Sequence, residues 1–596
     1  MWQTLGMFLR ATQRWKDGKA HRYWSIVENR RVHGRRIVQK TVLYLGEIND
    51  AQQAGWCRTI EALEDNRRVQ LSLFPEDREP PAECRAVQVR MDRLELSRPR
   101  QWGACWLALE LWEQLGLDEF WSDRLRPSRE GTRWLNVLKT LACYRLIEPG
   151  SEWRLHRLWF DQSALADILG EDFGIAEKDT LYRCLDKLVE HKAAMFSHLK
   201  ERWASLFGAK YDVLLYDLTS TYFESNPPFG EKDKRKYGHS RDKRSDCVQV
   251  IVALIVTPEG LPLAYEVLAG NTSDRTTLRD FLRRIEAQYG KASRIWVMDR
   301  GIPTEAVLKE MRASDPPIRY LVGTPKGRLS KLEKDLTVLP WQQVREGVEV
   351  KILPHDEELY VLAQSRDRVN KERSMRRRQL KTLWKRLKQL AGMKLKRDAL
   401  LLKLGAARQM SPSAWRLVQI VTPRAGEPLR FTLRKDRLRQ TRRREGRYLL
   451  RTNLTDTDPV RLWTFYTQLV RVEDAFRNLK GDLEIRPIYH QKENRIEAHI
   501  FVAFLAYCLH VTLAQRMKTY APGLTSRSIL EQLKAMQMLD VRVPTTDGRW
   551  LHMSRYTQPD KTQQLLLAQL GLVLPPQPPP KITSNKEKQI TDVVKT

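Results

Sequence analysis

The spacing of apolar residues changes along the chain, and each kind of spacing predicts a different kind of element. Residues 23–27 and 37–45 are strand-like runs with a turn at 33–34, which predicts a small β unit near the start of the chain. From about 102 to 207 the apolar residues recur at helical intervals. A β unit followed by a helical region is therefore expected.

Residues 211–323 switch to a mixture of strands and helices. Strands are predicted at 213–216, 248–256, 261–268, 295–298 and 319–323, and helices at 276–288 and 304–312. Three antiparallel strands followed by a helix, a strand, a helix and a strand match the order of a ribonuclease-H-like fold. The predicted fold class is a multidomain α+β protein with a ribonuclease-H-like α/β core.

This order breaks after residue 325, where short strands surround one long basic helix, expected at about 373–403. Its leucines follow a 3-4-3 spacing with Arg and Lys on the other faces, at Leu380, Leu383, Leu387 and Leu390. Either the helix packs on its own domain, or it forms a coiled-coil dimer. We interpret the region as a β-rich and helical insertion that interrupts the core.

Two further helices are predicted at 460–482 and 494–516, and a strand at 448–452 precedes them. From Pro575 the chain is proline-rich and then polar, which predicts a mobile tail. The predicted domains are an N-terminal β domain (1–70), a linker (71–99), a helical region (100–208), the first half of the core (209–325), the insertion (326–457), the second half of the core (458–520) and a C-terminal region (521–596).

Composition narrows the possible partners and compartments. The 596 residues carry a formal net charge of +31, which implies an anionic partner, most simply a nucleic acid. Seven cysteines form no CxxC pair, so neither a zinc knuckle nor a disulfide framework is indicated, and a reducing cytosol is expected. No signal peptide or P-loop is visible. The apolar stretch 500–514 is too short to span a bilayer and is expected to be a buried helix.

Three acidic residues are placed where they could bind a hard cation. Asp217 and Asp299 each end an apolar, strand-like run, and a carboxylate at a strand end leaves the core. Glu473 lies far downstream on a helical segment. Three carboxylates without histidine or cysteine suit Mg²⁺ or Mn²⁺ better than Zn²⁺. In a strongly basic chain, this set indicates metal-dependent chemistry on nucleic-acid phosphates.

The helix around Glu473 carries further polar residues at regular spacing. Tyr466 and Lys480 lie seven residues before and after Glu473, so one regular helix places all three on one face. Arg477 follows Glu473 by one turn. Either this face presents Glu473 to a metal and its neighbours to phosphate, or Glu473 and Arg477 form a solvated i,i+4 pair.

With these motifs, the sequence resembles the DDE transposases of bacterial insertion sequences, in the group with a Tyr-Arg-Glu-Lys signature. The resemblance covers most of the chain and includes the small β unit and the segments 211–221, 260–263, 270–274 and 299–301. The pattern Tyr-x2-Arg-x3-Glu-x6-Lys falls on Tyr466, Leu469, Glu473 and Lys480. Leu469 departs from the pattern, and Arg471 and Arg477 are both out of register with the family's arginine.

The resemblance implies that Asp217, Asp299 and Glu473 are the catalytic residues and hold two Mg²⁺ or Mn²⁺ ions. Two such ions can activate water and stabilise the leaving 3′-oxygen at a transposon end, and the freed 3′-hydroxyl can then attack target DNA. Four other acids compete for these roles, namely Glu224, Asp246, Asp274 and Glu484. Residues 271–274 could equally be a turn or a helix cap.

A basic loop at 232–244 follows the first of these acids and is a candidate for contacting DNA. The alternative is an ordinary solvated charge run. The candidate DNA-binding residues are Lys234, Arg235, Lys236, His239, Arg241, Lys243 and Arg244 in the loop, and Tyr466, Arg477 and Lys480 on the helix.

The sequence therefore predicts a transposase that binds terminal inverted repeats, cleaves DNA ends with Mg²⁺ and joins them to a target. Its expected partner is double-stranded DNA rather than a membrane, its expected assembly is a homodimer on paired ends, and its expected compartment is the bacterial cytoplasm, at the nucleoid. Two alternatives stay open: a nuclease on the same fold without strand transfer, and a non-catalytic DNA-binding protein descended from a transposase.

Overall fold

The chain folds into two compact units, seen in a computed structural model. The first comprises Met1–Thr12, Arg22–Ala292 and Val470–Thr596, and the second comprises Gln13–His21 and Ser293–Leu469. The protein is thus a multidomain chain of mixed α/β structure. The structure describes residues 4–16, 19–31, 37–49, 52–57, 60, 88–224, 230, 233–238, 240, 242, 244–272, 294–298, 304–324, 332, 335–336, 338–393, 395–421, 429–455, 458–521 and 523–583.

The N-terminal segment forms a three-stranded sheet, in the order β1 (Thr4–Lys16), β2 (Lys19–Arg31) and β3 (Ile37–Gly46). Trp24, Ile26 and Leu43 are buried on it. The two predicted strands are confirmed, and the predicted turn at 33–34 lies outside the described residues. Strand β1 was not predicted, because its many polar side chains hide the alternation that marks a strand.

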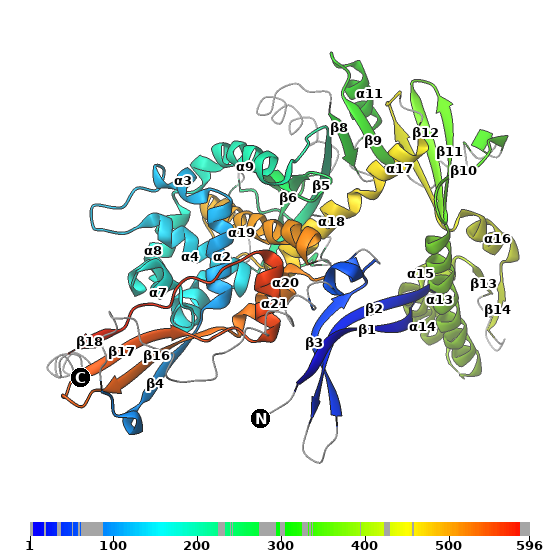
Figure 1. Ribbon diagram of the computed structural model, residues 1–596. Coiled ribbons are helices and arrows are strands. Elements are labelled where there is room, and N and C mark those ends of the chain that lie inside the picture. The colour runs from blue at the N-terminus through cyan, green and yellow to red at the C-terminus, as the bar shows by residue number, and fades with distance from the viewer. Residues whose placement is uncertain are drawn as a thin grey trace. The chain divides into compact units, whose positions relative to one another are not determined.

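Helices fill much of the first unit, as expected for 102–207. Among them are α2 (Gly103–Gln114), α4 (Trp134–Ile147), α8 (Lys178–Leu185) and α9 (Lys192–Phe207). Figure 1 shows α19 (Glu493–Tyr520) running among these helices. By length and composition α19 could cross a membrane, but 94% of its apolar window is buried in the fold. The expected buried helix is confirmed, and it is longer than the predicted apolar stretch.

Three antiparallel strands of the first unit carry the first predicted acid. Strand β5 (Val213–Phe223) pairs with β6 (Val248–Val256), which pairs with β7 (Pro262–Ala269). Asp217 lies opposite Leu254 in this register. The prediction that Asp217 ends its strand is wrong, because Leu218 to Phe223 continue the backbone pairing with β6.

In the second unit, sheet strands are neighbours in the order β10 (Gln342–Arg345), β11 (Val348–His355), β12 (Glu358–Ser365), β15 (Arg447–Thr452), β9 (Arg319–Thr324) and β8 (Ile295–Met298). Strands β8 and β9 are parallel, and helix α11 (Glu305–Ala313) connects them. Strand β15 is antiparallel to β9. Four strands of the predicted insertion, β10, β11, β12 and β15, therefore continue the sheet that contains β8 and β9, whereas β13 (Val418–Val421) and β14 (Arg430–Leu433) pair in a separate sheet. The helix predicted at 276–288 lies outside the described residues.

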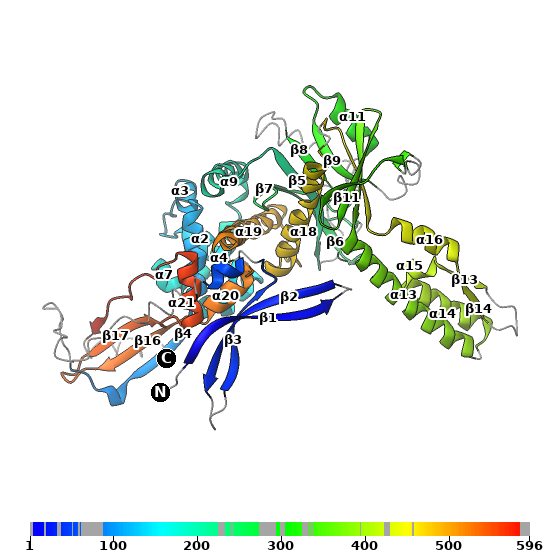
Figure 2. The ribbon, with the colours of Figure 1, turned by 45° about the vertical axis from the view of Figure 1, so that its right-hand side comes forward.

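The long basic helix is two helices rather than one. Helix α13 (Arg366–Gly392) ends where Met393 takes an extended conformation, and α14 (Arg397–Met410) begins after a short connection. Figure 2 shows the two helices side by side. Leu383, Leu387 and Leu390 pack in one core cluster with residues of α14. The leucine stripe thus packs on its own domain, where α14 covers it.

The C-terminal region adds a four-stranded sheet to the first unit, in the order β18 (Lys581–Thr583), β17 (Trp550–Tyr556), β16 (Gln537–Pro544) and β4 (Glu95–Gln101). The prediction of a mobile tail from Pro575 is wrong for residues up to 583. The Tyr556 hydroxyl bonds to the Pro575 carbonyl, and the Gln577 amide bonds to the Tyr556 carbonyl. Residues 584–596 lie outside the described residues.

Candidate active site and nucleic-acid interface

Asp217 lies within the paired part of β5 and is half-buried. Its Oδ1 accepts a hydrogen bond of 2.8 Å from the backbone N–H of Leu218, which restrains the carboxylate. Both flanking residues, Tyr216 and Leu218, are fully buried. Side chains alternate between the faces of a strand, so Asp217 points to the face opposite its two neighbours. The core therefore fixes the direction of this carboxylate.

Asp299 follows β8 directly, and all four residues of β8 are buried. Asp299 itself lies outside the described residues, as do the competing acid Asp274 and the segment 299–301. Of the prediction for Asp299, the structure confirms only that a buried strand precedes this residue.

Glu473 lies on α18 (Leu469–Arg477), which is an amphipathic helix. Val472, Ala475 and Phe476 are buried, whereas the Glu473 side chain is exposed. Arg477 forms its ion pair with Asp474. Within the described part of the chain no cation pairs with Glu473, so the structure does not contain the Glu473–Arg477 pair that the sequence offered as the alternative. Glu473 is a solvent-facing carboxylate held by a helix whose other face is anchored in the core.

The single helix predicted for 460–482 is wrong. Helix α17 (Pro459–Thr467) ends in a turn at Gln468, α18 follows it, and Asn478–Asp482 form a π-helical turn. A π turn has more residues per turn than an α-helix, so a seven-residue spacing across it no longer defines one face. The spacing of Tyr466, Glu473 and Lys480 therefore does not by itself place them together.

Tyr466 belongs to the second unit and packs in an aromatic group. Its ring centroid lies 5.5 Å from that of Tyr448 and 5.9 Å from that of Trp463. Lys480 belongs to the first unit, where its Nζ lies 2.9 Å from Oδ1 of Asp242. Arg486 pairs with the same carboxylate. Asp242 thus ties the turn after α18 to the basic loop, a contact that no sequence spacing indicated.

The described residues of the basic loop are largely paired with acids of the protein. The buried Arg235 places its Nη2 2.7 Å from Oδ2 of Asp233 and donates from Nη1 to Oε1 of Gln491 at 2.6 Å. The hydrogen bond from Arg235 is the main cause that lowers the pKa of Asp233. The alternative of a solvated charge run is therefore wrong for Arg235, because this side chain is buried and paired.

Two other loop cations also have acidic partners. Lys234 Nζ lies 3.0 Å from Oε1 of Glu493. Arg244 reaches Oδ2 of Asp246 at 3.0 Å and Oε1 of Glu224 at 3.1 Å, so two competing acids serve as its partners. Lys236 forms a backbone bridge with Gln249. The predicted contacts His239, Arg241 and Lys243 lie outside the described residues.

A basic cavity of about 640 Å³ lies beside α18 in the first unit. Arg471 and Arg477 line it together with Lys518, Arg527 and Asp474. Among the described residues neither Arg471 nor Lys518 has an ion-pair partner. Burial and then the nearby charge of Arg471 lower the pKa of Lys518. The two arginines that are out of register with the family signature thus share one concave surface whose positive charge is only partly balanced.

Comparison with known proteins places the chain in a family. Residues 208–509, just over half of the chain, match the model described as Transposase DDE domain. Residues 9–71 match the IS1634 family transposase N-terminal domain. No curated protein matches. A solved structure, the cryo-EM structure of piggyBac transposase synaptic complex with hairpin DNA, has a TM-score of 0.34 and 8% identity over 72% of this chain and 79% of that chain.

The match to the DDE domain includes Asp217, Asp299 and Glu473, and the domains of this family use divalent metal ions. The two family models confirm the resemblance to insertion-sequence DDE transposases that the sequence indicated. The chain belongs to the DDE transposases of insertion sequences.

Proposed function

We propose that this transposase binds the terminal inverted repeats of its element, cleaves the DNA ends by metal-assisted hydrolysis and joins the 3′-hydroxyl ends to target DNA. One observation carries the proposal: within the matched domain, Asp217 is fixed on β5 and Glu473 is presented to solvent on an anchored helix. Asp299, directly after β8, completes the proposed catalytic set.

A ribonuclease-H-like core is the fold we propose for this chemistry. The first unit supplies the antiparallel strands β5, β6 and β7, and the second supplies the parallel pair β8 and β9 joined through α11. These are the strand types and connection that the sequence order predicts for such a core. The proposed insertion then lies between β9 and α18 in the sequence.

The donor atoms of Asp217 and Glu473 fit a hard divalent cation, which we propose to be Mg²⁺ or Mn²⁺. Both residues offer carboxylate oxygens, the ligands that such ions prefer, and no described cation pairs with Glu473. When bound, a pair of such ions lowers the pKa of a water molecule and stabilises charge on a leaving oxygen. Asp217, Asp299 and Glu473 are the residues that would hold them.

In this proposal, residues of the protein hold the catalytic carboxylates in place and orient the DNA relative to them. The backbone N–H of Leu218 holds the Asp217 carboxylate, and the buried face of α18 holds Glu473. We propose that Arg471, Arg477 and Lys518 contact phosphates, because they line one cavity beside α18. Phosphate contacts of this kind set the register of the duplex, and base contacts elsewhere would supply the sequence specificity.

The deciding experiment uses supercoiled DNA that carries two terminal inverted repeats, with Mg²⁺ and a target plasmid. The proposal expects nicked or cut ends, followed by products in which element DNA is joined to the target. Cut ends without joined products would support the nuclease alternative. Specific binding without any cut would support the non-catalytic alternative.

The proposed assembly is a homodimer on paired ends, in the bacterial cytoplasm at the nucleoid. Light scattering of the protein with one-end and two-end DNA tests this assembly. Two protein chains per pair of ends are expected, and a single chain per pair would contradict the proposal.

A further inference from the structure

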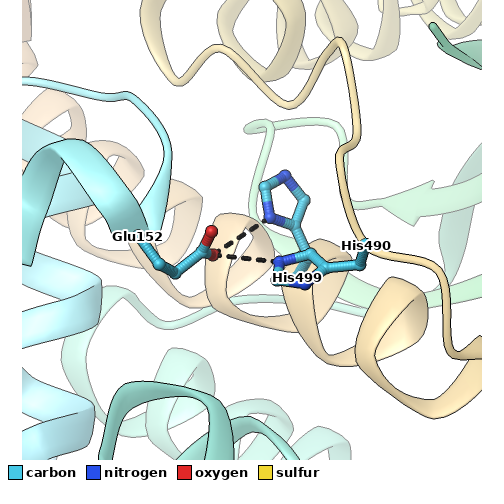
Figure 3. A group of neighbouring side chains, drawn as sticks. All are labelled: Glu152, His490 and His499. Atoms are coloured by element: carbon cyan, nitrogen blue, oxygen red, sulfur yellow. Dashed lines mark hydrogen bonds and ion pairs between the residues drawn. The ribbon is translucent and has the colours of Figure 1, made fainter. Parts of the chain in front are cut away.

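A second group of ligating side chains lies apart from the proposed catalytic acids, in the interior of the first unit. Glu152 comes from α5 (Glu152–Arg154), His499 comes from α19, and His490 lies in the segment between the π turn and α19 (Figure 3). Their exposed fractions are 6%, 3% and 7%, respectively. Three separate segments thus bring a carboxylate and two imidazoles together out of contact with solvent.

The two distances from Glu152 match the separation of neighbouring ligand atoms around a bound transition metal. Glu152 Oε1 lies 3.2 Å from His490 Nε2 and 3.3 Å from His499 Nδ1, and all three ligand atoms lie within 4.8 Å of one another. In a tetrahedral zinc site with bonds of about 2.0–2.1 Å, neighbouring ligand atoms are separated by about 3.3 Å. One ion could therefore contact all three atoms without a large rearrangement.

Hydrogen bonds within the group do not provide a partner for every polar atom of these three side chains. His499 Nδ1 lies 3.3 Å from the acceptor Glu152 Oε1 and also 3.4 Å from the donor Arg145 Nη2. One ring nitrogen can serve only one of these partners, because it either carries a proton or accepts one. His499 Nε2 is buried, and no described group hydrogen-bonds to it. An unpaired buried polar atom of this kind is costly and calls for an explanation.

Two imidazoles with one carboxylate are a donor set used by zinc.

We propose that Glu152, His490 and His499 bind one divalent transition metal of the zinc class as a structural site. The site would fasten the segment that leaves the π turn, and thereby α18, to α5 and α19. It is distinct from the oxygen-only site proposed for catalysis and does not depend on the proposed function.

Arg145 is the group that opposes a cation here. Its Nη2 lies 3.7 Å from Glu152 Oε1, and its Nη1 donates to the Glu484 carbonyl at 3.3 Å. Without a metal, the guanidinium neutralises Glu152. Removing the Arg145 charge should therefore strengthen metal binding if the site is real, whereas it would only leave a buried carboxylate unpaired if it is not.

The test uses the full chain without a polyhistidine tag, on an Asp217→Asn background that weakens the proposed catalytic site. The protein is dialysed with Zn²⁺, then against metal-free buffer, and the retained zinc is measured by mass spectrometry. About one zinc per chain is expected. Glu152→Gln and His499→Gln should lose it, and the matched control His510→Gln, buried on the same helix, should retain it.

Two further measurements remain informative if a ligand variant folds poorly. Arg145→Met should bind zinc at least tenfold more tightly than the parent protein, and Co²⁺ in the parent should give the visible absorption of a tetrahedral site. Zinc should also raise the melting temperature of the parent. The proposal is overturned if neither the parent nor Arg145→Met retains more zinc than His499→Gln, or if Arg145→Met binds zinc more weakly.

Discussion

The basic loop after β5 and the basic cavity beside α18 are both rich in arginine and lysine, but their charges are balanced differently. In the loop, Lys234, Arg235 and Arg244 each pair with a carboxylate of the protein. In the cavity, Arg471 and Lys518 share a surface with no ion-pair partner among the described residues. Charges that are paired internally are neutralised by their partners, whereas unbalanced charges are available to an external anion. A run of basic residues in a sequence cannot distinguish these cases.

The acidic residues also divide into unpaired and internally paired side chains. Replacing the proposed metal ligands should have the largest effect of the changes considered, a loss of end cleavage. Glu473 is exposed and pairs with no cation in the part of the chain that the structure describes, whereas Asp246 is paired with Arg244. Asp217→Asn, Asp299→Asn and Glu473→Gln should each reduce end cleavage by on the order of 10³-fold or more, equivalent to about 4 kcal/mol of barrier, and leave DNA binding largely intact.

Single-turnover cleavage and gel-shift binding are to be measured for each of these variants beside the wild type. Asp246→Asn is the matched control and should cleave normally. Near-normal cleavage by any of the three variants would remove that residue from the proposed metal ligands.

The next largest effect concerns stability in the loop. Arg235→Met leaves Asp233 and Gln491 without their buried partner, and breaking a buried pair costs about 3 kcal/mol. The urea midpoint of the first unfolding transition should fall accordingly. Arg244→Met, a change in an exposed ion pair of the same loop, should leave that midpoint unchanged. Equal midpoints for both variants would show that burial does not make the Arg235 pair more important for stability than the Arg244 pair.

Lys480 tests whether a paired charge can also serve catalysis. Its ion pair with Asp242 fixes the turn directly after α18, so Lys480→Ala should disturb the placement of Glu473. Small misplacements at a reacting centre can cost about 100-fold in rate. Cleavage should slow at least tenfold while binding changes much less. Lys534→Ala, which removes a lysine paired with Glu148, is the control. Unchanged cleavage in Lys480→Ala would make the Asp242 contact purely structural.

The salt dependence of binding compares the two basic regions directly. For duplex DNA, the slope of log affinity against log salt is about −0.9 per phosphate contact, and the wild type should be steeper than about −3. Replacing Arg471 and Lys518 by glutamine should make the slope shallower by about 1.8. The same double change at Lys234 and Arg244 should alter it less. If the loop variant changed the slope more than the cavity variant, the basic loop rather than the cavity would be the main DNA-contacting region.

The elements that could be predicted from the sequence are those with a local signal. Strands β6, β8 and β9 are short apolar runs, and α19 is a long one, so composition and periodicity suffice. No glycine or proline marks the end of α17 at Gln468, so this break in the helix could not be predicted from the sequence.

The candidate site residues also divide into those with a local signal in the sequence and those without one. Asp217, Asp299 and Glu473 were found because motifs surround them, and they stay predictions until they are tested. The Asp242–Lys480 pair and the Glu152–His499 contact join residues 238 and 347 positions apart in the chain. Only the folded chain brings such residues together, so no spacing rule could have identified them.

Tyr466 gives the smallest expected effect and tests the family signature itself. Its ring packs against both Tyr448 and Trp463, so Tyr466→Phe keeps the aromatic contacts and removes only the hydroxyl. Loss of one hydrogen bond costs about 1 kcal/mol, which corresponds to roughly a fivefold change in rate or affinity. Single-turnover cleavage should therefore fall by no more than about fivefold, whereas Tyr466→Ala should lower the stability of the second unit as well. A much larger loss of cleavage in Tyr466→Phe, with normal binding and melting, would assign the hydroxyl a direct role at the DNA end and would make the signature spacing more informative than the broken helix suggests.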